Sequence, residues 1–361
     1  MYSERRHITT LVTRWLLCLW GVIGLAACSA DSEPEEDTVG DVLQLSADTR
    51  AGNLVTIEGA GAEGSSIYIF TAIANTTATQ KQGTAVMTDD KWHSSIRVKK
   101  EQQYYLYGFM PVDVTDNPSI GKVDAGTDYD QSAVITLPNV DAICPHDLCV
   151  LIGVQDCNSA TDAKNVKVGK FSYVGKERGQ NYVHLLFRHV YASVVVKLKV
   201  DADYDKLRTI VLREMKLTST SGKNKYDITM AITANNTEAD PAEVTMTPVE
   251  SIANTPTFTL YKDVDGDAED GLTLTTTAVE FPAFFAPQTW SGMTLVTTYD
   301  VYDKEGWLVR PNCTVENKLT TPLSAQTLAA GEKLTITATI KPTYLYLLSE
   351  YDVDNPGITL K

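Results

Sequence analysis

The feature that most constrains the fold is a run of strand-forming residues that ends at Val200. It reads Tyr-Ala-Ser-Val-Val-Val-Lys-Leu-Lys-Val over residues 191–200. Its β-branched side chains favour an extended backbone and disfavour a helix. A strand of this kind is not stable alone, because its backbone N–H and C=O groups need partners. The chain must therefore supply further strands to pair with it.

Runs with the same two-residue period recur along the chain from Asp41 onward, and clusters of Gly, Asn, Asp and Pro separate them. Helix is expected only in short pieces, for instance around Pro145–Ile152. Many short strands at this spacing predict an all-β protein made of β-sandwiches. The predicted strands are Val42–Leu45, Ser66–Phe70, Trp92–Lys99, Gln103–Met110, Tyr182–Val200, Ile210–Thr218, Tyr226–Ile232, Leu272–Val279, Leu295–Tyr302 and Leu334–Ile340.

The length of the chain, 361 residues, is sufficient for two domains of ordinary size. The best boundary is the acidic run Asp-Ala-Asp-Tyr-Asp at residues 201–205, which follows the long strand directly. We therefore predict an N-terminal sandwich over residues 41–200 and a C-terminal sandwich over residues 201–361.

Residues 1–27 have the features of a secretory leader. Arg5, Arg6 and Arg14 supply the positive start, and the segment from Trp15 to Ala27 carries no charge. That segment is too short to span a bilayer. The sequence Leu-Ala-Ala-Cys at 25–28 resembles the lipobox of bacterial lipoproteins. The resemblance implies cleavage between Ala27 and Cys28, with lipid such as palmitate attached to Cys28. Ordinary secretion is the alternative.

The segment over residues 28–40 is acidic and almost without large apolar side chains. It cannot bury a core, so we expect a solvated tether between the lipid and the folded protein. An acidic stretch directly after the lipidated cysteine also resembles the surface-export signal of Bacteroidetes lipoproteins. That resemblance implies a surface-exposed lipoprotein of the outer membrane.

Charge and motifs argue against nucleic-acid binding and against catalysis. The formal net charge is −15, and no basic face is evident for a polyanion. The chain has no Gly-x-Ser-x-Gly, no His-Glu-x-x-His and no phosphate-binding glycine loop. His184 and His189 lie five apart on a predicted strand, so they point to opposite faces. We expect no enzymatic activity and no cofactor, and keep a hydrolase only as a remote alternative.

The cysteines left after the leader and Cys28 are even in number: Cys144, Cys149, Cys157 and Cys313. In an oxidising compartment they permit two disulfides, in any of three connectivities, or they are free buried thiols. A zinc site with His146 as a further ligand is the sharper alternative. The paired, closely spaced cysteines of structural zinc sites are missing, which disfavours it.

One cluster of oxygen ligands is a calcium candidate, namely Asp263, Asp265 and Asp267 around Gly266. Alternating aspartates can converge on Ca²⁺ where a glycine permits the turn. The glycine comes too early for a helix–loop–helix calcium site, and no glutamate closes the loop. A solvated hairpin loop is the favoured interpretation.

Several segments in order resemble the fimbrillin family of Bacteroidetes, the subunits and anchors of type V pili. Each motif is weak by itself, and their order along nearly the whole chain carries the resemblance. The matching pieces are the lipobox at Cys28, Thr49-Arg50-Ala51 after the first strand, Tyr104–Pro111, His146–Leu151, Leu186–Ala192 before the valine-rich strand, and Leu328–Lys333.

The resemblance implies two β-sandwich domains of transthyretin-like topology and assembly with other fimbrial subunits by strand exchange. A trypsin-like protease would cut between Arg50 and Ala51, removing the strand Val42–Leu45 and opening an apolar groove. The tail of another subunit would fill that groove, through backbone hydrogen bonds and alternate apolar side chains. Candidate donor segments are Leu334–Ile340 and Tyr344–Leu348, with Ile358 and Leu360 docking last.

The role within a fimbria is left open between shaft, tip and anchor. Without cleavage at Arg50 the lipid stays, and the protein is an anchor. A different class of function is a monomeric surface module that binds a glycan or protein on a host or bacterial surface. Such a site needs exposed aromatic side chains, and Trp92, Trp290 and Trp307 are the candidates, although burial in the core is favoured for each.

Overall fold

Strand is the dominant structure, as expected, and the all-β prediction is confirmed. The structure is a computed structural model, and residues 39–361 form one compact unit in it. The predicted leader (residues 1–27), Cys28 and the tether up to residue 39 lie outside the described residues. The described residues are 40–50, 64–73, 81–121, 132–159, 168–220, 223–233, 242–249, 256–263, 271–290, 292–319, 326–345 and 350–360.

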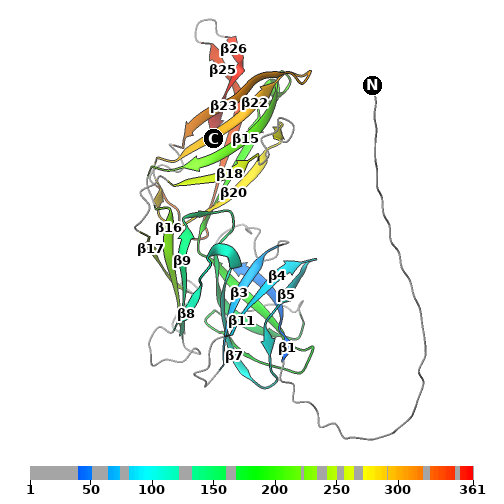
Figure 1. The fold of residues 1–361 in the computed structure, drawn as a ribbon, viewed down its shortest axis with the longest axis vertical. Coiled ribbons are helices and arrows are strands. Elements are labelled where there is room, and N and C mark those ends of the chain that lie inside the picture. The colour runs from blue at the N-terminus through cyan, green and yellow to red at the C-terminus, as the bar shows by residue number, and fades with distance from the viewer. Residues whose placement is uncertain are drawn as a thin grey trace, which may run out of the picture. The chain divides into compact units, whose positions relative to one another are not determined.

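One large sheet, the N-terminal sheet, is built from strands between residues 44 and 189 (Figure 1). Its order is β2 (Gln44–Arg50), β13 (Tyr182–His189), β11 (Cys149–Cys157), β7 (Gln103–Met110), β3 (Ser66–Ile73), β4 (Lys81–Thr88) and β5 (Lys91–Ser94), with β12 (Ser172–Val174) also on β7. All these neighbours are antiparallel except β2 and β13, which are parallel.

Three further sheets complete the main layers. The C-terminal sheet contains β10 (Ile143–Cys144), β20 (Val279–Phe285), β14 (Ala192–Val200), β25 (Lys333–Leu345) and β26 (Glu350–Leu360). The β15 sheet contains β18 (Thr257–Lys262), β15 (Thr209–Thr218), β22 (Thr294–Tyr302) and β23 (Leu308–Lys318), with β19 (Leu272–Leu274) also on β15. The β16 sheet contains β17 (Glu243–Pro248), β16 (Lys225–Thr233), β9 (Ser132–Asp141) and β8 (Ser119–Gly121).

The remaining elements are short. Two strand pairs are β1 (Asp41–Val42) with β6 (Arg97–Val98) and β21 (Thr289–Trp290) with β24 (Gln326–Thr327). The helices are η1 (Val112–Val114) and α1 (Ala202–Asp205), the second capped by the Asp201 carboxylate. The expected helical piece around residues 145–152 is wrong, because β11 begins at Cys149 and takes its apolar run into a sheet. No helix among the described residues is long and apolar enough to cross a membrane.

The predicted strand Tyr182–Val200 is two strands that belong to different sheets. It breaks at Val190–Tyr191, so β13 lies in the N-terminal sheet and β14 in the C-terminal sheet. There β14 pairs antiparallel with β20 and parallel with β25, which gives its backbone partners on both sides. This central position explains its continuous run of β-branched residues.

Two sheets combine strands from both sides of residue 200. The C-terminal sheet includes β10 and β14 from before it, and the β16 sheet pairs β9 with β16 from after it. Residue 200 is therefore not a boundary between sheets. The division into sandwiches over residues 41–200 and 201–361 stays a prediction about folding units.

The core includes strands that are buried on both faces, such as β7, β11 and β14, and strands that bury one face only. In β16 every second residue is buried, as expected for a sheet with one face covered. The β15 sheet and the C-terminal sheet meet at the rings of Tyr261 and Phe281, whose centroids are 6.0 Å apart. Trp290 is fully buried, packs edge-on against Phe285 and donates its indole N–H to the Ala286 carbonyl at 3.2 Å.

Replacing Trp290 with alanine should lower the free energy of unfolding by about 3–5 kcal/mol, because it empties a fully buried site. Urea unfolding followed by circular dichroism measures the change. Trp307→Ala is the matched control, because that side chain is 74% exposed, and its effect should stay within about 0.5 kcal/mol. Equal losses for the two variants would contradict the assignment of Trp290 to the core.

Candidate functional site

The first strands of the described chain pass from one sheet to another. β1 pairs with β6, and at Leu43 the chain crosses over, its N–H donating to the Ile96 carbonyl at 2.9 Å. The N–H of Gln44 then donates to the Asn181 carbonyl at 2.8 Å, and β2 continues along β13. The predicted strand Val42–Leu45 therefore spans this crossover, and the paired strand extends further, to Arg50.

β2 closes one edge of the N-terminal sheet. Its inner neighbour, β13, has β11 on the other side, so β2 alone covers the outer edge of β13. Leu43 and Leu45 are buried, at 0% and 5% exposure. Each such side chain contributes roughly 1.5–3 kcal/mol through burial. Loss of this segment would leave an unpaired backbone edge on β13 beside an apolar gap.

Polar contacts also hold this segment in place. The Asp41 carboxylate accepts hydrogen bonds from the Gly179 N–H at 2.7 Å and from the Asn181 amide at 2.9 Å. The Ser46 hydroxyl and the ring of the buried His184 form a hydrogen bond of 2.9 Å across the parallel pair. Arg50, the predicted cleavage residue, lies opposite Arg188 at the last pair of the ladder. Ala51 lies outside the described residues.

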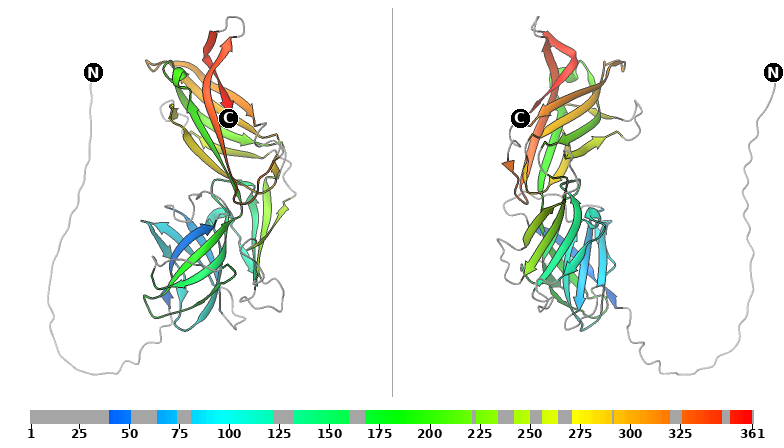
Figure 2. Two further views of the ribbon diagram at one scale, coloured as in Figure 1. Left: turned by 180° about the vertical axis from the view of Figure 1, so that it is seen from behind. Right: turned by 60° about the vertical axis from the view of Figure 1, so that its left-hand side comes forward.

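The C-terminal tail forms the edge of the C-terminal sheet, through the hairpin of β25 and β26. β25 is parallel to β14 only up to the pair Val200 and Ile340, whereas its pairing with β26 continues to Leu345. In the described chain, residues 341–345 thus pair with β26 alone, and Figures 1 and 2 show this hairpin extending past its neighbours. Of the predicted donors, Leu334–Ile340 is an internal strand. Ile358 and Leu360 lie on the edge strand β26, and residues 346–349 lie outside the described residues.

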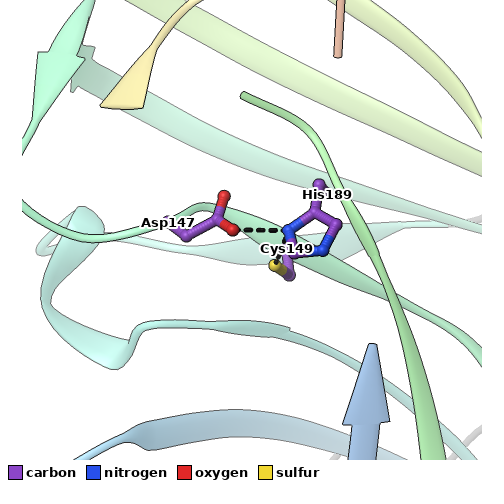
Figure 3. Close-up of side chains that lie close together, drawn as sticks. All are labelled: Asp147, Cys149 and His189. Atoms are coloured by element: carbon purple, nitrogen blue, oxygen red, sulfur yellow. Dashed lines mark hydrogen bonds and ion pairs between the residues drawn. The ribbon is translucent and has the colours of Figure 1, made fainter. Parts of the chain in front are cut away.

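A buried cluster of three side chains lies at the start of β11 (Figure 3). Cys149 is the first residue of β11 and lies opposite His189, the last residue of β13. Asp147 precedes Cys149 by two residues and forms a short hydrogen bond and ion pair with Nδ1 of His189. The Cys149 Sγ lies 3.4 Å from the same nitrogen.

Burial dominates the electrostatics of this cluster. Desolvation raises the pKa of the Asp147 carboxyl, against the lowering effect of the hydrogen bond from His189. Desolvation also raises the pKa of the Cys149 thiol well above its ordinary value, and the Asp147 charge adds to that. Asp147 Oδ1 and His189 Nε2 are buried and have no hydrogen-bond partner.

Sequence reasoning did not bring these three residues together. His189 is 40 residues beyond Cys149, and only the register of β11 against β13 places them side by side. The zinc alternative instead took His146, which is exposed, and cysteines that do not converge with it. The separation of His184 from His189 does match the structure, since they contact Ser46 and Asp147 respectively.

The four cysteines considered for disulfides are free, buried thiols in the structure, which is the second of the two alternatives left open by the sequence. Cys149 and Cys157 begin and end one nine-residue strand, which places their Cα atoms roughly 26 Å apart at the usual strand rise. A disulfide needs less than about 7 Å between Cα atoms. Cys144 lies in β10 and Cys313 in β23, in different sheets.

The first residue of the calcium candidate has another partner. The Asp263 carboxylate accepts a hydrogen bond from Arg213 Nη1 at 2.7 Å, and Arg213 Nε donates to Asp300 at 2.8 Å. These three side chains are nearly buried, so the pairing is structural. Asp265 and Asp267 lie outside the described residues. Asp263 is therefore explained without calcium.

The three tryptophans proposed for ligand binding have different environments. Trp290 is fully buried and Trp92 packs against the core, as favoured for both. Trp307 departs from that expectation, because it is 74% exposed. It follows the turn between β22 and β23, where the Asp303 carboxylate accepts a hydrogen bond from its backbone N–H at 2.7 Å. Leu308 and Val309 continue the exposed apolar run.

Comparison with known proteins gives no sequence match. No family model matches the chain, and no curated protein matches it.

Solved structures do resemble it at low identity. A candidate cell adhesion protein from Bacteroides fragilis has 9% identity and a TM-score of 0.43, over 89% of this chain and 97% of that one. Another from Bacteroides uniformis has 13% identity and a TM-score of 0.36, over 89% and 98%. A fimbrial protein from Bacteroides vulgatus has 14% identity and a TM-score of 0.31, over 89% and 98%. These likenesses are too distant to assign a function.

The free state of the cysteines can be tested with Ellman's reagent. It should detect all four thiols, Cys144, Cys149, Cys157 and Cys313, in unfolded, non-reduced protein in the presence of a chelator. The folded protein should react slowly, because the thiols are buried and burial raises the pKa of Cys144 to about 12. A count near zero in the unfolded state would show that the cysteines are paired. Mass spectrometry after alkylation without reductant is the independent control.

Proposed function

We propose that this protein is a structural and adhesive subunit of a cell-surface fimbria. It is exported as a lipoprotein attached through Cys28 to the outer membrane. Cleavage after Arg50 then starts assembly by donor-strand exchange with other fimbrial subunits. Two sandwiches of transthyretin-like topology, over residues 41–200 and 201–361, belong to the same proposal.

The observation that carries this proposal is the placement of β2. It is an edge strand that brings the buried Leu45 into the core, follows the buried Leu43 and ends at Arg50. Removal of a segment placed in this way opens one edge of a sheet without breaking any internal ladder. An open, apolar edge is unstable alone and takes up an added strand readily.

The donor in this proposal is the tail of another copy or of a related subunit. β26 is the more suitable strand, since it lies at the edge of the C-terminal sheet and its release breaks one ladder only. The internal part of β25 would have to leave both β14 and β26. The strand Leu334–Ile340 therefore becomes the less favoured donor.

Arg50→Ala tests the cleavage step in the native host. The unchanged protein should begin at Ala51 and form a ladder of polymers on gels run without boiling. The variant should begin at acylated Cys28 and stay monomeric, because β2 still occupies its edge. Intact mass and N-terminal sequencing identify the two forms.

Arg178→Ala is the control for this experiment, because Arg178 is an exposed loop arginine that a trypsin-like protease could also attack. It should process and polymerise normally. Polymerisation of Arg50→Ala with unchanged efficiency would refute the cleavage step. An unchanged protein that itself begins at acylated Cys28 would indicate an anchor.

A second candidate function is glycan binding at Trp307, which its exposure favours. Exposed Leu308 and Val309 follow it in the sequence, and exposed apolar groups mark interaction sites. A glycan array probed with the unchanged protein should give signals that Trp307→Ala loses and Leu308→Ala largely keeps. A blank array, or signals that survive Trp307→Ala, would remove this function.

A further inference from the structure

The Asp147–Cys149–His189 cluster is built on a rigid part of the fold. Cys149 and His189 are direct cross-strand partners, so their side chains leave the same face of the N-terminal sheet. The Val190 N–H donates to the Leu148 carbonyl at 2.8 Å, which fixes the segment that carries Asp147. The three side chains therefore meet without help from a mobile loop.

Their donor atoms converge. The Asp147 carboxylate, the Cys149 Sγ and a ring nitrogen of His189 all lie within 4.8 Å of one another. All three residues are buried, with exposures of 8%, 1% and 2%. Asp147 Oδ1 has no hydrogen-bond partner, which is costly for a buried carboxylate oxygen.

We propose that Asp147, Cys149 and His189 bind a single zinc ion. Thiolate, imidazole and carboxylate are the ligand types that Zn²⁺ takes in proteins. A tetrahedral zinc with bonds of about 2.0–2.3 Å places its donor atoms about 3.4 Å apart. The Sγ and Nδ1 atoms are already 3.4 Å apart. Asp147 and His189 need to separate only until their direct hydrogen bond is replaced by bonds to the metal.

The unpartnered carboxylate oxygen supports four-coordination. If Asp147 binds through both oxygens, the donor set is Oδ1, Oδ2, Sγ and Nδ1, and Oδ1 gains the partner it lacks. The tetrahedron is then distorted, because one carboxylate holds its two oxygens closer together than tetrahedral ligands lie. Binding releases the thiol proton of Cys149 to solvent. The Nδ1 proton of His189 leaves to solvent from an imidazolium or moves to Nε2 in the neutral ring, so the bound imidazole is neutral in both cases. The charges of a thiolate, a carboxylate and Zn²⁺ then sum to zero, which suits a site without water.

The competing interpretation is a structural Asp147–His189 hydrogen bond without metal. It accounts for the Asp147–His189 contact and for the thiol as a hydrogen-bonding group beside both residues, but it leaves Asp147 Oδ1 unpartnered. His189 Nε2 lacks a partner in both states, so that atom does not distinguish them. The two interpretations differ in the metal content of the protein.

The test refolds purified full-length protein from urea with or without equimolar zinc chloride, because a buried site fills most readily during folding. After desalting, mass spectrometry of the metal should find about one zinc per chain. The zinc form should melt at a higher temperature, and unfolding with a chelator should reverse the difference. Refolding with cobalt(II) should produce a thiolate-to-metal absorption band in the near ultraviolet and the visible bands of four-coordinate, distorted tetrahedral cobalt.

Cys149→Ser and Asp147→Asn should lose the zinc and the near-ultraviolet cobalt band. Cys157→Ser is the control, because Cys157 is a buried thiol at the other end of the same strand, and it should keep both. The proposal is overturned if the unchanged protein refolds without zinc and without a cobalt spectrum. It is equally overturned if metal binds but Cys149→Ser retains the full amount with an unchanged spectrum. The spectrum of the unchanged protein decides the question even where a variant fails to fold.

Discussion

Parallel strand pairing between distant segments is the constraint on which this structure depends. β2 joins β13 across 138 residues of sequence, as its Ser46–His184 contact shows, and β25 joins β14 in the other large sheet. A parallel pair cannot be closed by a short turn, so each needs most of a sheet to be in place first. The two parallel pairs differ in their position within the sheet. β14 and β25 lie inside their sheet, whereas β2 lies at an edge and is the one strand of its pair that can be removed without breaking another ladder.

The sequence was most informative where strands are continuous and apolar. Gln103–Met110 was predicted with its observed bounds, and Ile210–Thr218 lies within one residue of β15. Prediction of strands from the sequence failed where a strand contains residues of low strand propensity. β9 contains Pro138 and a left-handed Asn139 (φ 57°), and its pairing with β16 shifts register near that point, so alternation is lost locally. The sequence around residues 145–152 predicts a short helical piece, whereas β11 begins at Cys149 with a run that is buried on both faces, and a short run of that kind shows no strand alternation.

The candidate site residues were likewise hard to predict wherever their positions depend on how distant strands pair. The exposure of Trp307 was not predictable, because a tryptophan in a strand-rich sequence is usually buried, and only the position of the β22–β23 turn places it outside. The buried cluster was not predictable either, since strand register decides which residues lie opposite one another. A pattern of linear spacing offered His146 beside two cysteines, whereas the fold turns that imidazole outward and brings His189 in its place.

The interleaving of sheets across residue 200 has a consequence for how the protein is made. β9 lies before that residue but pairs with β16 after it, and β14 obtains both of its neighbours from the last third of the chain. In the proposed export from the N-terminus, the C-terminal sheet cannot be completed until nearly all of the chain has emerged, whereas the β16 sheet needs the chain only as far as Pro248. In that proposal, the edge of β14 that pairs with β25 stays open until late in export, when a strand of another chain can reach it.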